Sequence, residues 1–198
     1  ELTPADRDPF ASRNNPAIAL QNTGRLAEAR AVYEETLGAI FASGERNAGV
    51  AILLVNLGTL HKQLGDPAQA ESCYRRALEL EVATYGDHHA RYVPPLRGLV
   101  DILVERGELE EAEDLARRCL EITRLATPEG RPLGVEISWL ARVLSKRGDY
   151  ARAEPLYAEA LALFPGEPHG FDWLNCAPNL GTALLLNGKL DAAAELPV

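Results

Sequence analysis

Five glycines divide the sequence into nearly equal parts and constrain its fold more than any other feature. They follow one another at separations of 41, 42, 41 and 40 residues, at Gly24, Gly65, Gly107, Gly148 and Gly188. Five residues after each glycine comes an alanine, at Ala29, Ala70, Ala112, Ala153 and Ala193. Self-similarity at a fixed period of 20–50 residues is typical of proteins built from stacked copies of one small unit. We therefore predict five consecutive copies of one unit.

The second copy, residues 51–85, shows what the unit is. Before Gly65, the residues Leu54, Leu57, Gly58 and His61 follow helical spacing, and after it Ala70, Tyr74 and Ala77 do the same. Apolar or small residues at such intervals mark one face of an α-helix. The glycine between them predicts a tight turn. Each unit should therefore be two amphipathic helices folded back on each other, with alanines where the first helix approaches closely.

This stretch resembles a tetratricopeptide repeat, whose signature is W-x₂-L-G-x₂-Y…A-x₃-F. Leu54 stands in for the tryptophan, His61 for the first tyrosine and Tyr74 for the phenylalanine. The long period and the connector at residues 84–90 resemble the repeats of kinesin light chains. The resemblance implies an all-α, right-handed superhelical solenoid of about five antiparallel helix pairs.

We expect one domain over residues 1–198, with repeats at 10–47, 48–89, 90–130, 131–170 and an incomplete one at 171–198. Ten helices are predicted, at 15–22, 26–43, 48–64, 67–85, 90–106, 109–126, 133–147, 150–164 and 172–187, with a short one from 190. Asp66 should cap its helix, with Pro67 in the first turn. Residues 1–9 should be irregular. Because proline disrupts a helix interior, Pro155 and Pro178 predict a bend or a delayed start.

Composition narrows the possible partners and the compartment. The net charge of −9 argues against nucleic acid as a partner, because phosphate binding needs a basic face. The apolar runs are far shorter than the roughly 20 residues that a membrane helix needs. Three cysteines without paired spacing favour a reducing, cytoplasmic compartment and core positions. No methionine occurs, so an upstream signal removed by processing stays open as an alternative.

The outward face of each first helix is the candidate binding surface. With the turn glycine counted as position 15, positions 4, 7, 8 and 11 face the second helix, whereas positions 2, 5, 6, 9, 12 and 13 face away. We call these outward positions the polar wall, and we expect stacking to make it the concave face of the superhelix. The candidate peptide-binding residues on it are Asn15, Asn56, Thr59, Lys62, Gln63, Arg97, Asp101, Ser138, Trp139, Arg142, Lys146, Asn179 and Thr182.

Asparagine recurs at position 6, in Asn15, Asn56 and Asn179, and an amide there can bind an extended peptide backbone. The resemblance to kinesin light chains implies the same role. Gly98 and Trp139 break the pattern, which argues against a continuous clamp. The alternatives are that the asparagines are merely solvated and that Trp139 packs on the next repeat rather than anchoring a ligand.

Signs of catalysis are poor. Residues 87–89, Asp-His-His, have no further ligands spaced around them, so we expect a structural loop rather than a metal site. His61 should be a packed, hydrogen-bonded histidine, and the glutamates at 108, 110, 111 and 113 suit a helix N-terminus. We expect no enzyme activity, no cofactor and no metal.

Two functions remain. The first is a scaffold that binds a peptide or protein segment. The second is a sensor or regulatory arm of a larger signalling protein (an ATPase, protease or transcription regulator), which the resemblance associates with bacteria. We expect the chain to be part of a longer protein, because Leu184, Leu185, Leu186 and Leu190 would otherwise stay uncovered. A homodimer through these leucines is compatible with either function.

Overall fold

The computed structural model describes residues 9–44, 48–86, 89–164 and 171–194. In this part of the chain every regular element is helical, so the predicted all-α class is confirmed. The elements are α1 (Pro9–Asn22), α2 (Leu26–Ala42), α3 (Ala48–Gln63), α4 (Pro67–Tyr85), the 3₁₀ turn η2 (Ala90–Tyr92), α5 (Val93–Arg106), α6 (Leu109–Ala126), α7 (Arg131–Arg147), α8 (Tyr150–Leu163), α9 (Phe171–Leu186) and α10 (Leu190–Ala194). None of these helices is both long and apolar enough to span a bilayer.

Most helix bounds lie within two residues of the prediction, and the structure differs from the prediction at three places. Helix α1 begins at Pro9 and contains Pro16, so the predicted start at residue 15 was wrong. The irregular structure expected for residues 1–9 was also wrong at Pro9, and residues 1–8 lie outside the described part. The third repeat opens with η2, whose start is capped by the His89 side chain.

Of the two outcomes expected at Pro155 and Pro178, a bend or a delayed start, the delayed start is wrong, because both prolines lie inside continuous helices. Asp149 accepts a hydrogen bond from the backbone N–H of Arg152 and thereby fixes the start of α8 before Pro155. In α9, Cys176 and Ala177 are buried just before the proline. Packing on a helix face contributes more to helix stability than one backbone hydrogen bond.

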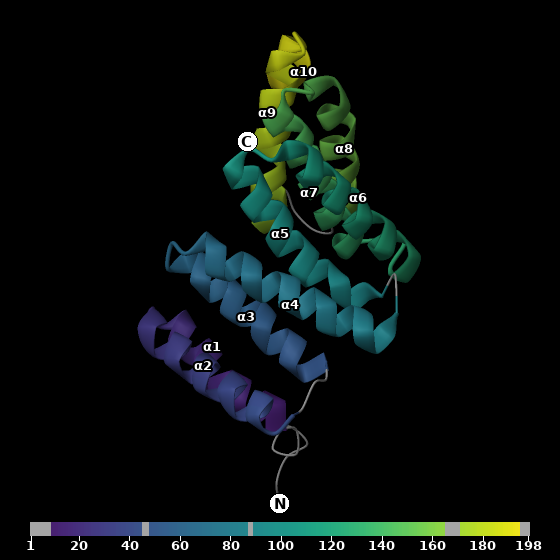
Figure 1. Ribbon diagram of the computed structural model, residues 1–198. Coiled ribbons are helices and arrows are strands. Elements are labelled where there is room, and N and C mark those ends of the chain that lie inside the picture. The colour runs from purple at the N-terminus through teal and green to yellow at the C-terminus, as the bar shows by residue number, and fades with distance from the viewer. Residues whose placement is uncertain (1–8, 45–47, 87–88, 165–170, 195–198) are drawn as a thin grey trace, which may run out of the picture. The chain divides into compact units, whose positions relative to one another are not determined.

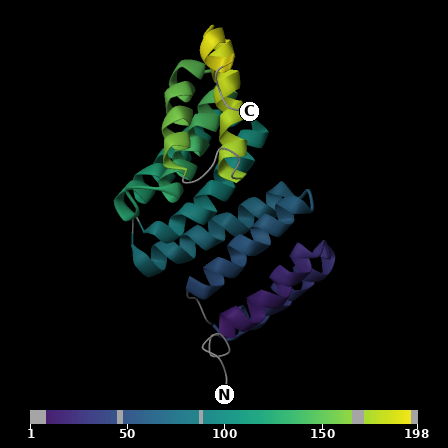
Figure 2. The same ribbon diagram turned by 180° about the vertical axis from the view of Figure 1, so that it is seen from behind.

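The chain divides into two compact units, residues 1–102 and 103–198, and the boundary falls within α5. In the first unit, α1 packs on α2 and α3 packs on α4, and α3 also contacts α1 and α2. In the second unit, α7 packs on α6 and α8, and α9 packs on α8, α7 and α10. Figures 1 and 2 show the two helices of each of the pairs α1/α2, α3/α4 and α7/α8 side by side.

The turn inside each repeat explains the recurring glycine. Gly148 has φ +86°, a left-handed conformation that glycine adopts without the strain a side chain would bring. Its N–H donates to the carbonyl of Ser145, and the N–H of Asp149 donates to that of Leu144. This pair of hydrogen bonds satisfies the last carbonyls of the helix. The same pair recurs at the other four turn glycines.

Small residues and tyrosines of the second helices fill the core, as the spacing predicts. The alanines at 29, 70, 112 and 153 have no exposed surface, and Tyr33, Tyr74 and Tyr157 are buried. The three cysteines are buried and reduced, which confirms their core positions. His61 is buried as well, which confirms its packed position, and in the described residues its Nδ1 makes no hydrogen bond.

The ring of Tyr74 in α4 is enclosed by two glycines of the flanking first helices. A methyl group on Gly58 of α3 would lie 2.8 Å from its Cε1 atom, and one on Gly98 of α5 would lie 2.4 Å from its Cζ atom. The Tyr74 hydroxyl lies 3.2 Å from the Thr59 hydroxyl. Gly98 therefore leaves the space that this ring occupies.

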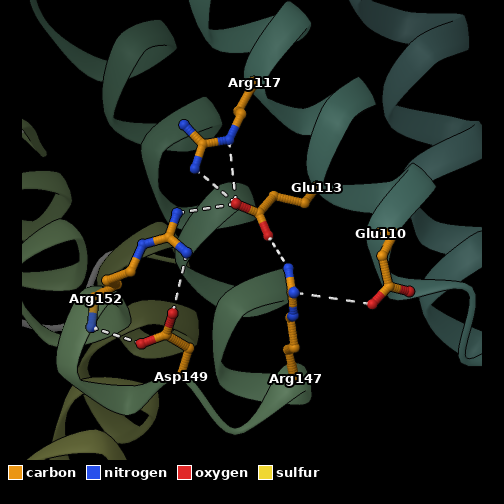
Figure 3. A network of polar contacts seen from close by, with 6 residues as sticks. All are labelled: Glu110, Glu113, Arg117, Arg147, Asp149 and Arg152. Carbon is orange, nitrogen blue, oxygen red and sulfur yellow. Dashed lines mark hydrogen bonds and ion pairs between the residues drawn. The ribbon is translucent and has the colours of Figure 1, made fainter.

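A buried carboxylate connects the helices at the start of the second unit (Figure 3). Glu113 of α6 accepts hydrogen bonds from Arg117 (2.6 Å), Arg147 of α7 (2.7 Å) and Arg152 of α8 (2.9 Å). These guanidinium groups, Arg117 most of all, lower the pKa of Glu113 to about 2 although burial opposes them. Glu113, which was predicted to suit a helix N-terminus, thus also forms a contact between the third and fourth repeats.

The next junction contains an equivalent contact. Glu154 of α8 accepts hydrogen bonds from the Asn187 amide (2.8 Å) and from Lys189 (2.7 Å). Asn187 and Arg147 each directly precede the turn glycine of their repeat. We call this arrangement the carboxylate clasp: a glutamate of one second helix holds the turn of the following repeat.

Candidate binding site on the first helices

The polar wall is accessible where the structure describes it. Every candidate residue on it is half-buried or exposed, whereas the opposite stripe is buried in α3, α5 and α7. In α1, by contrast, Pro16 of that stripe is exposed and Leu20 is half-buried. In the third repeat, for example, Leu96, Leu99, Val100 and Leu103 are all buried. The helical periodicity therefore separated the two faces correctly in α3, α5 and α7.

In the first unit, polar side chains of the wall bind one another across neighbouring first helices. The Asn56 amide donates to Oδ1 of Asn14 (2.9 Å), and the Gln21 amide donates to Oε1 of Gln63 (2.8 Å). Lys62 forms an ion pair with Asp101. A ligand on this part of the wall would have to compete with these contacts.

In the second unit, the wall is hollowed between α7 and α9. This recess, the α7–α9 pocket, has a volume of about 390 Å³. Its lining combines residues of three helices, namely Val135, Ser138, Trp139 and Arg142 of α7, Tyr157 of α8, and Asp172, Asn175, Cys176 and Asn179 of α9. Its volume lies within the range of pockets that hold small ligands or single side chains.

Arg142 and Trp139 form a fixed edge of this pocket. The Arg142 guanidinium carbon lies 3.9 Å from the centroid of the Trp139 ring, a cation–π contact that strengthens when both groups lose water. Burial lowers the pKa of Arg142, and Tyr157 and Glu105 oppose that effect. Asp172 at the pocket is paired with Arg131.

The structure brings together some of the predicted site residues and separates others. Ser138, Trp139, Arg142 and Asn179 share the pocket. Asn179 donates to the carbonyl of Asn175 in its own helix, and Thr182 does the same to Pro178. The remaining candidates lie outside the pocket, namely Asn15, Asn56, Thr59, Lys62, Gln63, Arg97, Asp101, Lys146 and Thr182.

Sequence reasoning missed Tyr157, Asp172 and Cys176 as pocket residues. Tyr157 belongs to a second helix and follows the core pattern, so periodicity alone assigns it to the interior. Burial raises the pKa of Cys176 to about 12, so this thiol is a poor nucleophile.

The part of the chain that the structure describes gives no sign of a metal site. Of the Asp-His-His segment, residues 87 and 88 lie outside the described part, and the His89 ring stacks on Tyr85 at 4.4 Å. The residues that are described contain no group of three or more histidine, cysteine or acidic side chains arranged for a metal ion.

Comparison with known families agrees with this geometry. One tetratricopeptide repeat model matches residues 9–81 and 49–124, and a second matches residues 140–196. The chain belongs to the tetratricopeptide repeat family. As predicted, its repeats are similar to those of proteins related to kinesin light chains.

Two proteins are similar in sequence to parts of this tetratricopeptide repeat chain. Over 96 residues it is 31% identical to mitochondrial tetratricopeptide repeat protein 19 of Homo sapiens. The aligned region covers 48% of this chain and 24% of that protein. Over 111 residues it is 27% identical to protein KINESIN LIGHT CHAIN-RELATED 1 of Arabidopsis thaliana. The aligned region covers 55% of this chain and 18% of that protein. The chain thus spans a quarter or less of the length of these relatives.

Solved structures share the fold of this tetratricopeptide repeat chain. BtubC (BKLC) from P. vanneervenii superposes with a TM-score of 0.79 at 20% identity, over 90% of this chain and 72% of its own. A Rap protein in complex with Competence and Sporulation Factor superposes with a TM-score of 0.74 at 17% identity. This superposition covers 94% of this chain and 51% of the Rap chain.

Proposed function

We propose that this chain is a non-catalytic interaction module that binds an extended segment of a protein or peptide on its polar wall. The observation that supports this function is the α7–α9 pocket, because it is a recess on the predicted face with an aromatic edge and a charged group. Aromatic and arginine side chains dominate binding hot spots. The Rap protein, which has the same fold, was solved with a bound factor.

The proposal also suggests where binding energy is concentrated. In the first unit, the Asn56–Asn14 and Gln21–Gln63 amide pairs and the Lys62–Asp101 ion pair already use hydrogen-bonding and charged groups of the wall. In the second unit, Trp139 and Arg142 surround a space that a side chain of the ligand can fill. We therefore expect the pocket to contain the anchor and the first unit to add weaker contacts.

Trp139→Ala should weaken binding at least tenfold, because it removes the aromatic edge of the pocket. Peptides would first be selected on the intact chain from a random phage-displayed library. The affinity of the strongest peptide would then be measured by fluorescence anisotropy for the parent chain and the variant. Circular dichroism melting would check that the fold survives.

Phe41→Ala is the matched control. Phe41 is also an aromatic residue that stacks with an arginine, since Arg76 lies 4.9 Å from its ring centroid. It belongs to a second helix, however, and lines a separate recess with Arg76 and Leu80. Equal losses from Phe41→Ala and Trp139→Ala would mean that the wall is not the binding surface.

Self-association is a second candidate property. Leu185, Leu186 and Leu190 are 53%, 56% and 67% exposed, which is unusual for three leucines so close together. Leu184, which we expected to be uncovered too, is buried because it lies at core-facing position 11 of its repeat.

Replacing Leu185, Leu186 and Leu190 by serine should shift a concentration-dependent dimer to a monomer. Light scattering over a hundredfold range of concentration would measure the mass of both chains. A parent chain that stays monomeric throughout would exclude self-association. That result would leave the proposal of peptide binding on the wall unchanged.

A further inference from the structure

The start of the third repeat is held by a histidine side chain. Nδ1 of His89 accepts a hydrogen bond from the backbone N–H of Arg91 (3.2 Å) and thereby caps η2. The N–H of Tyr92 donates to the carbonyl of His89. The two residues that follow Val93 are prolines, which have no N–H to donate. This junction therefore relies on its cap more than an ordinary helix start does.

Only the neutral ring of His89 can make this contact. A neutral imidazole has one nitrogen that accepts and one that donates, whereas both nitrogens donate in the protonated ring. Protonation would put a hydrogen on Nδ1, opposite the N–H of Arg91, and the cap would be lost. Histidine ordinarily changes its charge between about pH 5 and pH 8, so a histidine cap is open to control by pH.

A buried carboxylate in the same place favours the protonated ring. Glu81 of α4 is 3% exposed, and among the described residues its Oε2 atom has no hydrogen-bond donor. Burial raises the pKa of Glu81, whereas the charges of Arg91 and His89 act in the opposite direction. A buried acceptor without a donor costs free energy, which a positively charged ring that donates to it would recover.

Aromatic contacts keep the His89 ring between α4 and η2. Its centroid lies 4.4 Å from that of Tyr85 and 6.4 Å from that of Tyr92. The Arg91 guanidinium lies 5.4 Å from the Tyr85 centroid. The described titratable and charged groups around the ring thus come from both elements, namely Glu81 and Tyr85 of α4 and Arg91 and Tyr92 of η2. The cation Arg91 opposes protonation of the ring, and the carboxylate of Glu81 favours it.

We propose that His89 is a pH-sensitive cap at the connection between the second and third repeats. At neutral pH its ring accepts the hydrogen bond from Arg91 and holds η2. On acidification the half-buried ring takes up a proton from solvent at Nδ1, releases the Arg91 N–H and donates to the Glu81 carboxylate, so that η2 opens. Acid would then loosen the start of α5 while the helices on either side stay folded.

Nuclear magnetic resonance of the intact chain between about pH 8 and pH 5 would test this cap. Long-range proton–nitrogen correlation spectra report which ring nitrogens carry hydrogen, and backbone amide spectra report the hydrogen bond of Arg91. We expect the His89 ring to gain a hydrogen at Nδ1 and the Arg91 amide signal to move with the same midpoint. Exchange of the Tyr92 and Val93 amides, corrected for its intrinsic pH dependence, should become about tenfold faster.

Two substitutions test the two sides of the ring. His89→Asn introduces a side chain that caps helices but does not titrate, so the pH dependence of the Arg91 amide signal should disappear. Glu81→Gln keeps the size of the buried side chain and removes its negative charge. The midpoint of the His89 transition should therefore move to lower pH by about one unit.

His88→Gln is the matched control, because it removes the neighbouring histidine of the sequence and leaves the cap. Its transition should match that of the parent chain. A His89 ring that stays neutral down to about pH 5 would overturn the proposal, and so would a ring that titrates while the Arg91 amide is unchanged. The same holds for a midpoint that is equal in Glu81→Gln, or for a transition that survives in His89→Asn or is lost in His88→Gln.

Discussion

Glu113→Ala should lower the free energy of unfolding of the second unit by about 2–4 kcal/mol. The Glu113 side chain is 9% exposed and joins three arginines from three helices, so its removal leaves these cations without their common partner. The arginines are about half exposed and can regain water, which keeps the effect below that of a fully buried pair. Chemical denaturation followed by circular dichroism would measure the change.

Glu110→Ala is the control for that substitution. Glu110 lies one helical turn before Glu113 and is also near Arg147, at 3.9 Å, but its side chain is 80% exposed. Exposed ion pairs contribute little, so we expect less than about 0.5 kcal/mol. A similar effect at both positions would mean that the network in Figure 3 does not stabilise the unit.

The stability due to Glu113 should depend on pH in a defined window. Its pKa falls from 4.5 to about 2 on folding, so the stabilisation is complete above pH 4.5 and is lost as the pH falls towards 2. A shift of this size corresponds to roughly 3 kcal/mol. The difference in stability between the parent chain and Glu113→Gln should therefore shrink from pH 5 to pH 2. The other acidic groups are the same in both chains, so their contributions to the pH dependence cancel in this difference.

Gly98→Ala should destabilise the first unit by about 2–3 kcal/mol, although a single methyl group is added. That methyl group would lie within 2.7 Å of three atoms of the Tyr74 ring. The ring has little room to shift, because Gly58 lies against it on another helix and its hydroxyl meets Thr59. Thermal and urea unfolding of the two chains would measure the difference.

Gly38→Ala is the opposite case in the same unit. Gly38 lies within α2, and no atom outside its helix surroundings comes within 4 Å of the added methyl group. Alanine favours helix over glycine, so this variant should be stabilised by up to about 1 kcal/mol. If Gly98→Ala were equally harmless, the ring would not be enclosed as described. Replacing Tyr74 by leucine in the Gly98→Ala chain should recover part of the loss.

The helices and their two faces could be predicted from the sequence because both are set locally. Glycine turns, the Asp66 cap and the 3.6-residue period fix where helices begin and which side is buried. The 3₁₀ turn at Ala90–Tyr92 and the continuous helices around Pro155 and Pro178 could not be predicted, because there the surroundings outweigh local preference.

The candidate site was predicted less completely, because contacts between repeats have no local signature. The amide of Asn56 was expected to face a ligand, yet it donates to Asn14. Gly98 seemed to interrupt a clamp, but it makes room for Tyr74. At the corresponding positions of the next junction the sequence has Ala116 and Trp139, so a small residue on one helix again accompanies a large one on the other.

The carboxylate clasp gives the repeats a fixed order. Glu113 and Glu154 each reach forward to a cation or an amide of the following repeat, so the contact runs in one direction along the chain. A permuted array that placed the fifth repeat directly after the third would bring Glu113 to Asn187 and Lys189 and leave the arginines of the fourth without it. Shuffled copies of these repeats should therefore join less stably than the native succession, although every copy contains the same glycine turn.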